Sequence, residues 1–125
     1  MKRITPNSVV DAYIATGMYP VFRKWSTRDN KGGCGLIVTL CSLNGSYPKH
    51  KSRFDTIVKV LGLELDYARG FTRGFDGRPP LNYSEYFDIG QHDGRAAREA
   101  VREYFGIGRR KKALSRSSTP ELATV

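Results

Sequence analysis

Two pairs of glycines place the strongest constraint on how this chain folds. Gly70 and Gly74 lie in a segment whose apolar residues recur at helical spacing, and Gly90 and Gly94 lie in a second such segment. A glycine inside a helix costs about 0.5–1 kcal/mol relative to alanine. We expect close approach of the two helix backbones to offset this cost, since glycine has no side chain to hold them apart.

The two glycine-bearing segments are predicted to be helices over 65–76 and 83–105. Arg78-Pro-Pro-Leu81 reads as a short, stiff connector, and Asn82 with Glu85 resembles a capping pair for the second helix. Helices joined by so short a loop are expected to be antiparallel neighbours. The predicted helix-packing residues are Tyr67, Gly70, Phe71, Gly74, Gly90 and Gly94.

Two further helices carry start and stop signals. Thr5 followed by Pro6 predicts a helix over 6–16 that Gly17 ends. Ser52 is the expected cap of a helix over 53–61, with Gly62 as its stop.

The apolar run 34–43 fits two structures. Its branched residues and flanking glycines suit a strand paired with 21–25, but it equally suits a short helix buried on all sides, which we favour. The predicted fold is therefore mainly α, a small bundle of four to five short helices around the antiparallel glycine-notched pair. The alternative is an α+β fold with one β-hairpin within 21–43. Residues 1–106 are expected to form a single globular domain, and 107–125 a basic, flexible tail.

Positive charge is the main compositional signal. The chain of 125 residues has a formal net charge of +9. The tail alone contributes +4, from Arg109, Arg110, Lys111, Lys112 and Arg116 against Glu121. This charge either serves solubility alone or fits an anionic partner such as nucleic acid or an acidic protein surface.

Arginines at helical spacing extend the basic tail into the globular part. Arg69 and Arg73 are four residues apart, and Arg95, Arg98 and Arg102 share one face of the last predicted helix. We predict a non-enzymatic protein that binds nucleic acid through phosphates. The alternative is an adaptor or inhibitor, such as a phage or bacterial accessory protein, that docks on an acidic protein. The predicted contacts in either case are Arg69, Arg73, Arg95, Arg98, Arg102, Arg109, Arg110, Lys111 and Lys112.

No catalytic or metal-binding pattern is apparent, so neither catalytic residues nor a cofactor is predicted. Cys34 and Cys41 are too far apart in sequence for usual zinc spacing, and neither His50 nor His92 lies in a metal motif. Asp76 is expected to end a helix. Asp93 is expected to form an ion pair with Arg69, Arg73 or Arg78. With no signal-like or membrane-spanning segment, we expect a cytoplasmic location.

Overall fold

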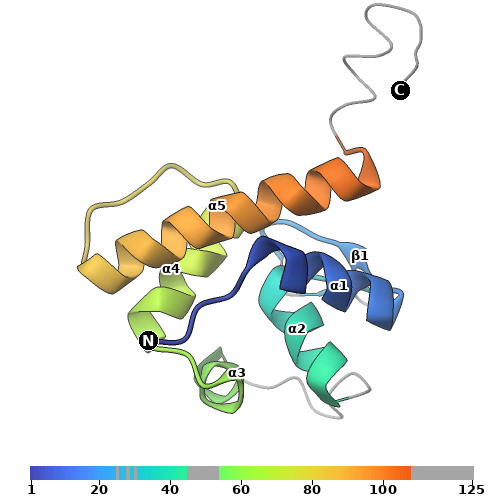
Figure 1. Cartoon of the computed structure of the whole chain (residues 1–125), viewed down its shortest axis with the longest axis horizontal. Helices are drawn as coiled ribbons and strands as arrows, with labels where there is room; N and C mark the ends of the chain where they lie inside the picture. Colours follow the sequence, from blue (N-terminus) through green and yellow to red (C-terminus); the bar gives the residue numbers. More distant parts are fainter. Residues whose placement is uncertain (25, 28, 30, 45–53, 108–125) are drawn as a thin grey trace, which may run out of the picture.

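The computed structural model describes residues 1–107 apart from 25, 28, 30 and 45–53. In these residues the chain forms five helices and two very short strands, which confirms the prediction of a mainly helical bundle (Figure 1). The helices are α1 (Pro6–Thr16), α2 (Gly35–Asn44), α3 (Phe54–Leu61), α4 (Leu65–Phe75) and α5 (Glu85–Phe105), and the strands are β1 (Tyr19–Pro20) and β2 (Gly32–Gly33). Within the described ranges, none of the helices combines the length and the apolar character that crossing a bilayer requires. The predicted basic tail lies almost wholly outside the described residues.

The first helix has the predicted bounds and ends. The Thr5 side chain accepts a hydrogen bond from the backbone N–H of Ser8, and Pro6 occupies the first turn. Gly17 ends α1 with φ 71°, a left-handed conformation that glycine adopts without a steric penalty. Gly62 has the same φ of 71° directly after α3. The predicted cap of α3, Ser52, lies outside the described residues.

The run 34–43 is helical, so the favoured prediction is confirmed and the hairpin alternative is wrong for this segment. Residues on every side of α2 are buried, including Leu36, Ile37 and Val38. They are buried because α1, α3 and α4 all contact this helix. Two short strands lie outside this run and pair in parallel, Tyr19 with Gly32 and Pro20 with Gly33, whereas the alternative required an antiparallel hairpin between 21–25 and 34–43.

The glycine-bearing helices α4 and α5 pack as predicted but run parallel, which corrects the antiparallel prediction. A Cβ built on Gly70 would lie 2.1 Å from the carbonyl oxygen of Phe87, and one on Gly74 would lie 2.3 Å from that of Gln91. Reciprocally, a Cβ on Gly90 would lie 2.1 Å from the carbonyl oxygen of Tyr67. From Gly70 to Gly74 on α4, the facing residue on α5 thus changes from Phe87 to Gln91, in the same direction along the chain. Only parallel helices make contacts in this order.

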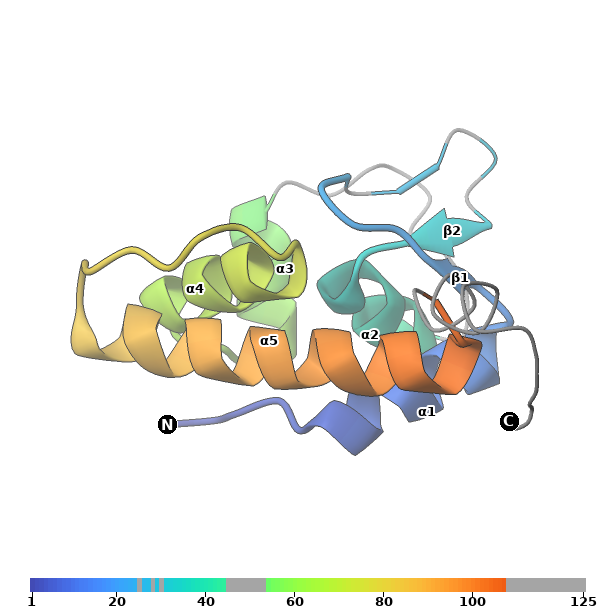
Figure 2. The same ribbon diagram turned by 90° about the horizontal axis from the view of Figure 1, so that it is seen from above.

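The connector between α4 and α5 explains this direction. It contains nine residues, 76–84, and returns along the helix pair to the level at which α4 begins (Figures 1 and 2). Extended chain covers about 3.3 Å per residue and a helix only 1.5 Å, so nine residues exceed the length of the 11-residue α4. The cap of α5 is correspondingly Ser84, whose side chain accepts from the N–H of Phe87, and not the predicted Asn82.

Buried aromatic rings line the glycine contact, as expected. Tyr67, Phe71 and Phe75 of α4 are fully or almost fully buried. The rings of Phe71 and Phe75 lie nearly parallel, with centroids 6.2 Å apart and an interplanar angle of 9°. The α4–α5 pair is thus a closely packed support for the connector that lies along it.

Candidate functional site

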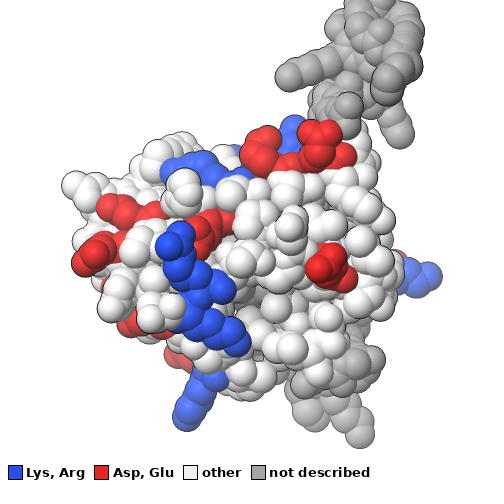
Figure 3. Space-filling view, viewed as in Figure 1, with Lys and Arg blue, Asp and Glu red and all other residues white. Residues whose placement is uncertain are grey.

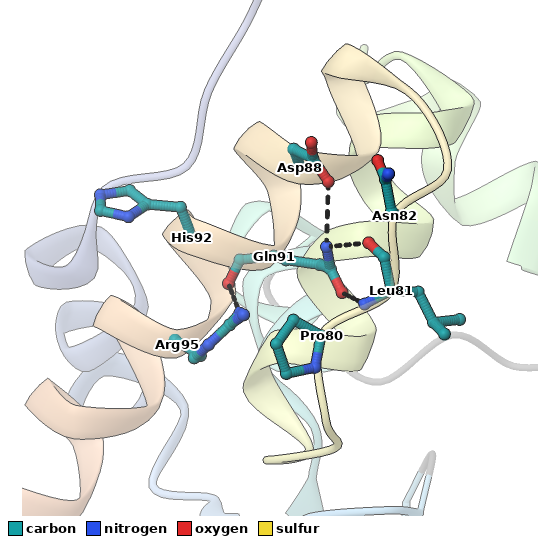
Figure 4. Close-up of a pocket in the computed structure, with 7 residues that line it drawn as sticks. All are labelled: Pro80, Leu81, Asn82, Asp88, Gln91, His92 and Arg95. Carbon is teal, nitrogen blue, oxygen red and sulfur yellow. Dashed lines mark hydrogen bonds between the residues drawn. The ribbon is translucent and has the colours of Figure 1, made fainter.

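The connector and α5 enclose an open depression, which we call the Gln91 hollow. Its volume is about 600 Å³. Figure 4 shows Gln91 at its centre, between Asp88 on α5 and the connector. The hollow is lined by Pro80, Leu81, Asn82, Asp88, Gln91, His92 and Arg95.

Gln91 fixes the connector to the helix. Its side-chain amide nitrogen donates to the carbonyl oxygen of Leu81 at 2.8 Å, and its amide oxygen accepts from the Leu81 N–H at 2.7 Å. The same nitrogen lies 3.3 Å from a carboxylate oxygen of Asp88. Gln91 is buried, and these bonds satisfy its polar atoms away from water. The neighbouring Pro80 is therefore held in one position.

A second depression, the arginine hollow, adjoins the first. Its volume is about 370 Å³, and it shares Pro80 and Arg95 with the Gln91 hollow. The arginine hollow is lined by Gly77, Arg78, Pro79, Pro80, Arg95, Arg98 and Glu99. Three arginines and one glutamate thus border this space.

Arg98 is held firmly at the wall of the arginine hollow. One of its terminal nitrogens donates to the carbonyl oxygen of Phe75 at 3.0 Å, at the end of α4. Its guanidinium carbon lies 4.5 Å from the ring centroid of Phe22, a cation–π arrangement. Partial burial, and then the nearby charge of Arg102, lower the pKa of Arg98. The guanidinium is therefore positioned before any partner arrives.

Asp76 ends α4, as predicted, and has an unforeseen partner. Its carboxylate accepts a hydrogen bond of 2.8 Å from the backbone N–H of Arg23, which has a left-handed φ of 66°. Arg78 Nε lies 4.0 Å from the same carboxylate. Burial raises the pKa of Asp76, although these neighbours act in the opposite direction. Asp76 therefore links the 21–24 bend to the end of α4.

Asp93 does not pair with Arg69, Arg73 or Arg78, which corrects that prediction. It is buried and accepts two hydrogen bonds from Arg3, at 2.9 and 2.7 Å. The hydroxyl of Tyr67 donates to it at 2.7 Å. Burial alone raises the pKa of Asp93, but the hydrogen bonds from Arg3 and Tyr67 outweigh it, so the pKa is lowered.

This pairing fastens the N-terminal segment to the helix pair. The Tyr67 hydroxyl also accepts a hydrogen bond of 2.7 Å from the backbone N–H of Ile4, a buried residue. Arg3 and Asp93 are 90 positions apart in the sequence. Asp93 thus joins the first residues of the chain to α4 and α5, instead of joining α5 to the connector.

The predicted basic contacts are only partly brought together. Arg95 and Arg98 meet at the arginine hollow. Arg69 is exposed beside Asp66, with 4.0 Å between nitrogen and oxygen, and Arg73 donates to the carbonyl oxygen of Pro79 at 2.6 Å. Arg102 is half-buried farther along α5. The predicted contacts Arg109, Arg110, Lys111 and Lys112 lie outside the described residues.

The described residues are almost neutral. They contain twelve Lys and Arg and eleven Asp and Glu, which leaves a net charge of +1. Figure 3 shows basic side chains in a narrow band on one face, with acidic side chains beside it. Eight of the nine net positive charges therefore belong to segments beyond the described residues.

No grouping of three or more His, Cys, Asp or Glu in the described part of the chain is arranged to hold a metal ion. Cys34 and Cys41 are buried free thiols, and burial raises the pKa of Cys34 to about 12. A thiol that stays protonated is a poor nucleophile and metal ligand. His92 is exposed on α5, and His50 lies outside the described residues.

Comparisons of the chain with protein-family models, curated proteins and solved structures found no match. Functional statements therefore depend on the residues themselves. The sequence prediction missed Arg3 and Arg23, whose partners are 90 and 53 positions away. It also missed Gln91, for which a signal existed: a polar residue directly after Gly90 on the close-packed helix face.

Proposed function

We propose that this protein is a small, non-enzymatic nucleic-acid-binding protein that contacts phosphates through charge. The observation that carries the proposal is the distribution of charge. The described residues have a net charge of only +1, and the other +8 belongs to Arg28, the 45–53 segment and the 108–125 segment. Dense positive charge in short segments is typical of phosphate-backbone binding.

The arginine hollow adds a second reason. Arg78, Arg95 and Arg98 surround it, and Glu99 is the one carboxylate in its lining. Guanidinium groups bind phosphate oxygens through paired N–H donors. The arginine hollow therefore offers a phosphate site, and the segments outside the described residues carry most of the net positive charge.

A salt series on two matched variants tests the proposal. The first variant replaces Arg110, Lys111 and Lys112 with Gln, and its control replaces Lys24, Lys31 and Lys59, which are exposed, with Gln. Each variant has three fewer positive charges than the wild type. If the 109–112 segment binds phosphates, only the first variant shows weaker duplex binding and a shallower slope of log K against log salt. The slope should fall by roughly 0.9 for each phosphate that is no longer neutralised.

The folded part should survive removal of the tail. Truncation after Ile107 keeps the hydrogen bond from its N–H to the carbonyl oxygen of Arg102, which closes α5. We expect an unchanged melting temperature with weaker nucleic-acid binding. If the full chain binds neither DNA nor RNA at low salt, the proposal is wrong and the acidic-protein alternative replaces it.

A further inference from the structure

We propose that the two hollows together bind one nucleotide unit of a single-stranded nucleic acid, with its phosphate in the arginine hollow and its sugar and base in the Gln91 hollow. The inference rests on the proposed function and names the form of nucleic acid that the described residues recognise. It goes beyond binding through charge in the basic segments, because it assigns a defined site to α5 and the connector.

The phosphate half rests on the three arginines of the arginine hollow. Arg98 uses one nitrogen for Phe75, and Arg95 uses one for the carbonyl oxygen of Gln91 at 3.3 Å. A guanidinium has five N–H donors, so most of the donors on both side chains are left for a ligand. Arg78, whose side chain is 47% exposed, borders the same space.

These arginines are positioned before the ligand binds. Arg98 is stacked on Phe22 and bonded to the end of α4, and Arg95 is bonded to its own helix. Fixed side chains lose little entropy on binding, which favours affinity. Glu99, together with Asp76 at 4.0 Å from Arg78, supplies two carboxylates to three guanidinium groups, so a phosphate adds negative charge where the arginines are in excess.

The nucleoside half rests on the Gln91 hollow. Its volume of about 600 Å³ lies within the ordinary range of ligand sites, roughly 300–1,000 Å³. His92, Pro80 and Asn82 line this hollow: the exposed imidazole of His92 offers an aromatic face to a base, Pro80 an apolar contact, and Asn82 an amide for hydrogen bonds. Aromatic side chains, including histidine, commonly stack on unpaired bases.

The two halves form one site because they share Pro80 and Arg95. The Gln91–Leu81 hydrogen bonds keep Pro80 in place between them. A base reaches the Gln91 hollow only when it is unpaired, since the bases of a duplex are stacked and paired inside it. The site therefore favours single strands over duplexes.

Fluorescence anisotropy of a twelve-nucleotide oligo(dT), fluorescently labelled at its 3′ end and titrated with the full chain, tests the inference. Arg95→Gln should weaken binding roughly five- to tenfold, the effect of removing one charge-assisted hydrogen bond. The matched control is Lys59→Gln, which removes one positive charge from an exposed site on α3 outside both hollows. Its affinity should change by less than about twofold. His92→Ala should weaken oligo(dT) binding about fivefold and duplex binding little.

Arg78→Gln is a second test of the phosphate half and should also weaken oligo(dT) binding. Arg78 lies on the connector, so its replacement does not alter a helix. Thermal melts establish that each variant is folded. Equal losses of affinity for Arg95→Gln and Lys59→Gln would overturn the site and leave the proposed function intact. Absence of binding by the full chain to any oligonucleotide would overturn both.

A measurement with inorganic phosphate alone tests the arginine hollow independently of nucleic-acid binding. Inorganic phosphate should shift the NMR signals of the Arg78 and Arg95 side-chain Nε–H groups more than that of Arg69. Equal shifts at all three arginines would show that the hollow does not select phosphate. Selective shifts together with preferential binding of single strands support the inference.

Discussion

Alanine at Gly70 is the sharpest test of the helix pair. Its Cβ would lie 2.1 Å from the carbonyl oxygen of Phe87 and 2.9 Å from the carbonyl carbon. Ordinary contact begins near 3.4 Å, so the two backbones must separate locally by the difference, roughly 1.3 Å. The neighbour is backbone of a long helix, which cannot rotate away as a side chain can.

The expected loss of stability follows from three contributions. Overpacking costs about 1–3 kcal/mol. Separation also weakens the backbone contact at the four glycines, where a Cβ would lie 2.1–2.3 Å from a carbonyl oxygen of the facing helix, a geometry that suits Cα–H···O contacts worth about 0.5–1 kcal/mol each. Alanine recovers about 0.5–1 kcal/mol through its higher helix propensity. We therefore expect a net loss of about 2–4 kcal/mol, or a fall in Tm of roughly 10 °C.

Gly35→Ala is the matched control, since Gly35 is helical but faces movable side chains. A Cβ there would lie 3.3 Å from the Phe75 ring and 3.4 Å from the Phe71 ring, so we expect a change within about 1 kcal/mol. Gly70→Ala and Gly90→Ala combined should cost less than the sum of their separate effects, because the first substitution already separates the helices. Urea unfolding measures all four variants. A Gly70→Ala protein as stable as wild type would refute the close contact.

Acid unfolding tests the two buried carboxylates. The pKa of Asp93 is lower in the folded than in the unfolded protein, where it is about 3.9. Ionised Asp93 therefore stabilises the fold fully above about pH 3.9, and this stabilisation is lost as the pH falls through the folded pKa. Asp93→Asn should consequently lose less stability between pH 7 and 3 than wild type. The pKa of Asp76 is raised in the folded protein, so protonation of Asp76 favours the folded state, and Asp76→Asn should lose more stability than wild type over the same pH range. The reverse order of the two variants in urea unfolding would contradict the pKa directions of both carboxylates. Tyr67→Phe should lower the free energy of unfolding by about 1–3 kcal/mol, because the buried Ile4 N–H loses its acceptor and Asp93 keeps only the hydrogen bonds from Arg3. An unchanged unfolding midpoint for this variant would show that the N-terminal segment is not fastened there.

Several local features of the fold were determined by the sequence alone. Thr5, Pro6 and Gly17 set both ends of α1, because a cap acts within three or four residues of its own position. The four glycines likewise marked the close helix contact. The apolar run 34–43 left helix and strand nearly balanced, and burial among three neighbouring helices decided for helix.

The direction of the helix pair was decided only by the tertiary structure. Glycines four residues apart permit close approach in either direction, and the sequence of the connector did not reveal that Gln91 would hold Leu81 along the side of α5. The parallel arrangement in turn brought Asp93 to Arg3 and placed Arg78, Arg95 and Arg98 around one hollow. Such partners carry no local signal, because their proximity results from how whole helices pack and not from the residues next to them in the chain.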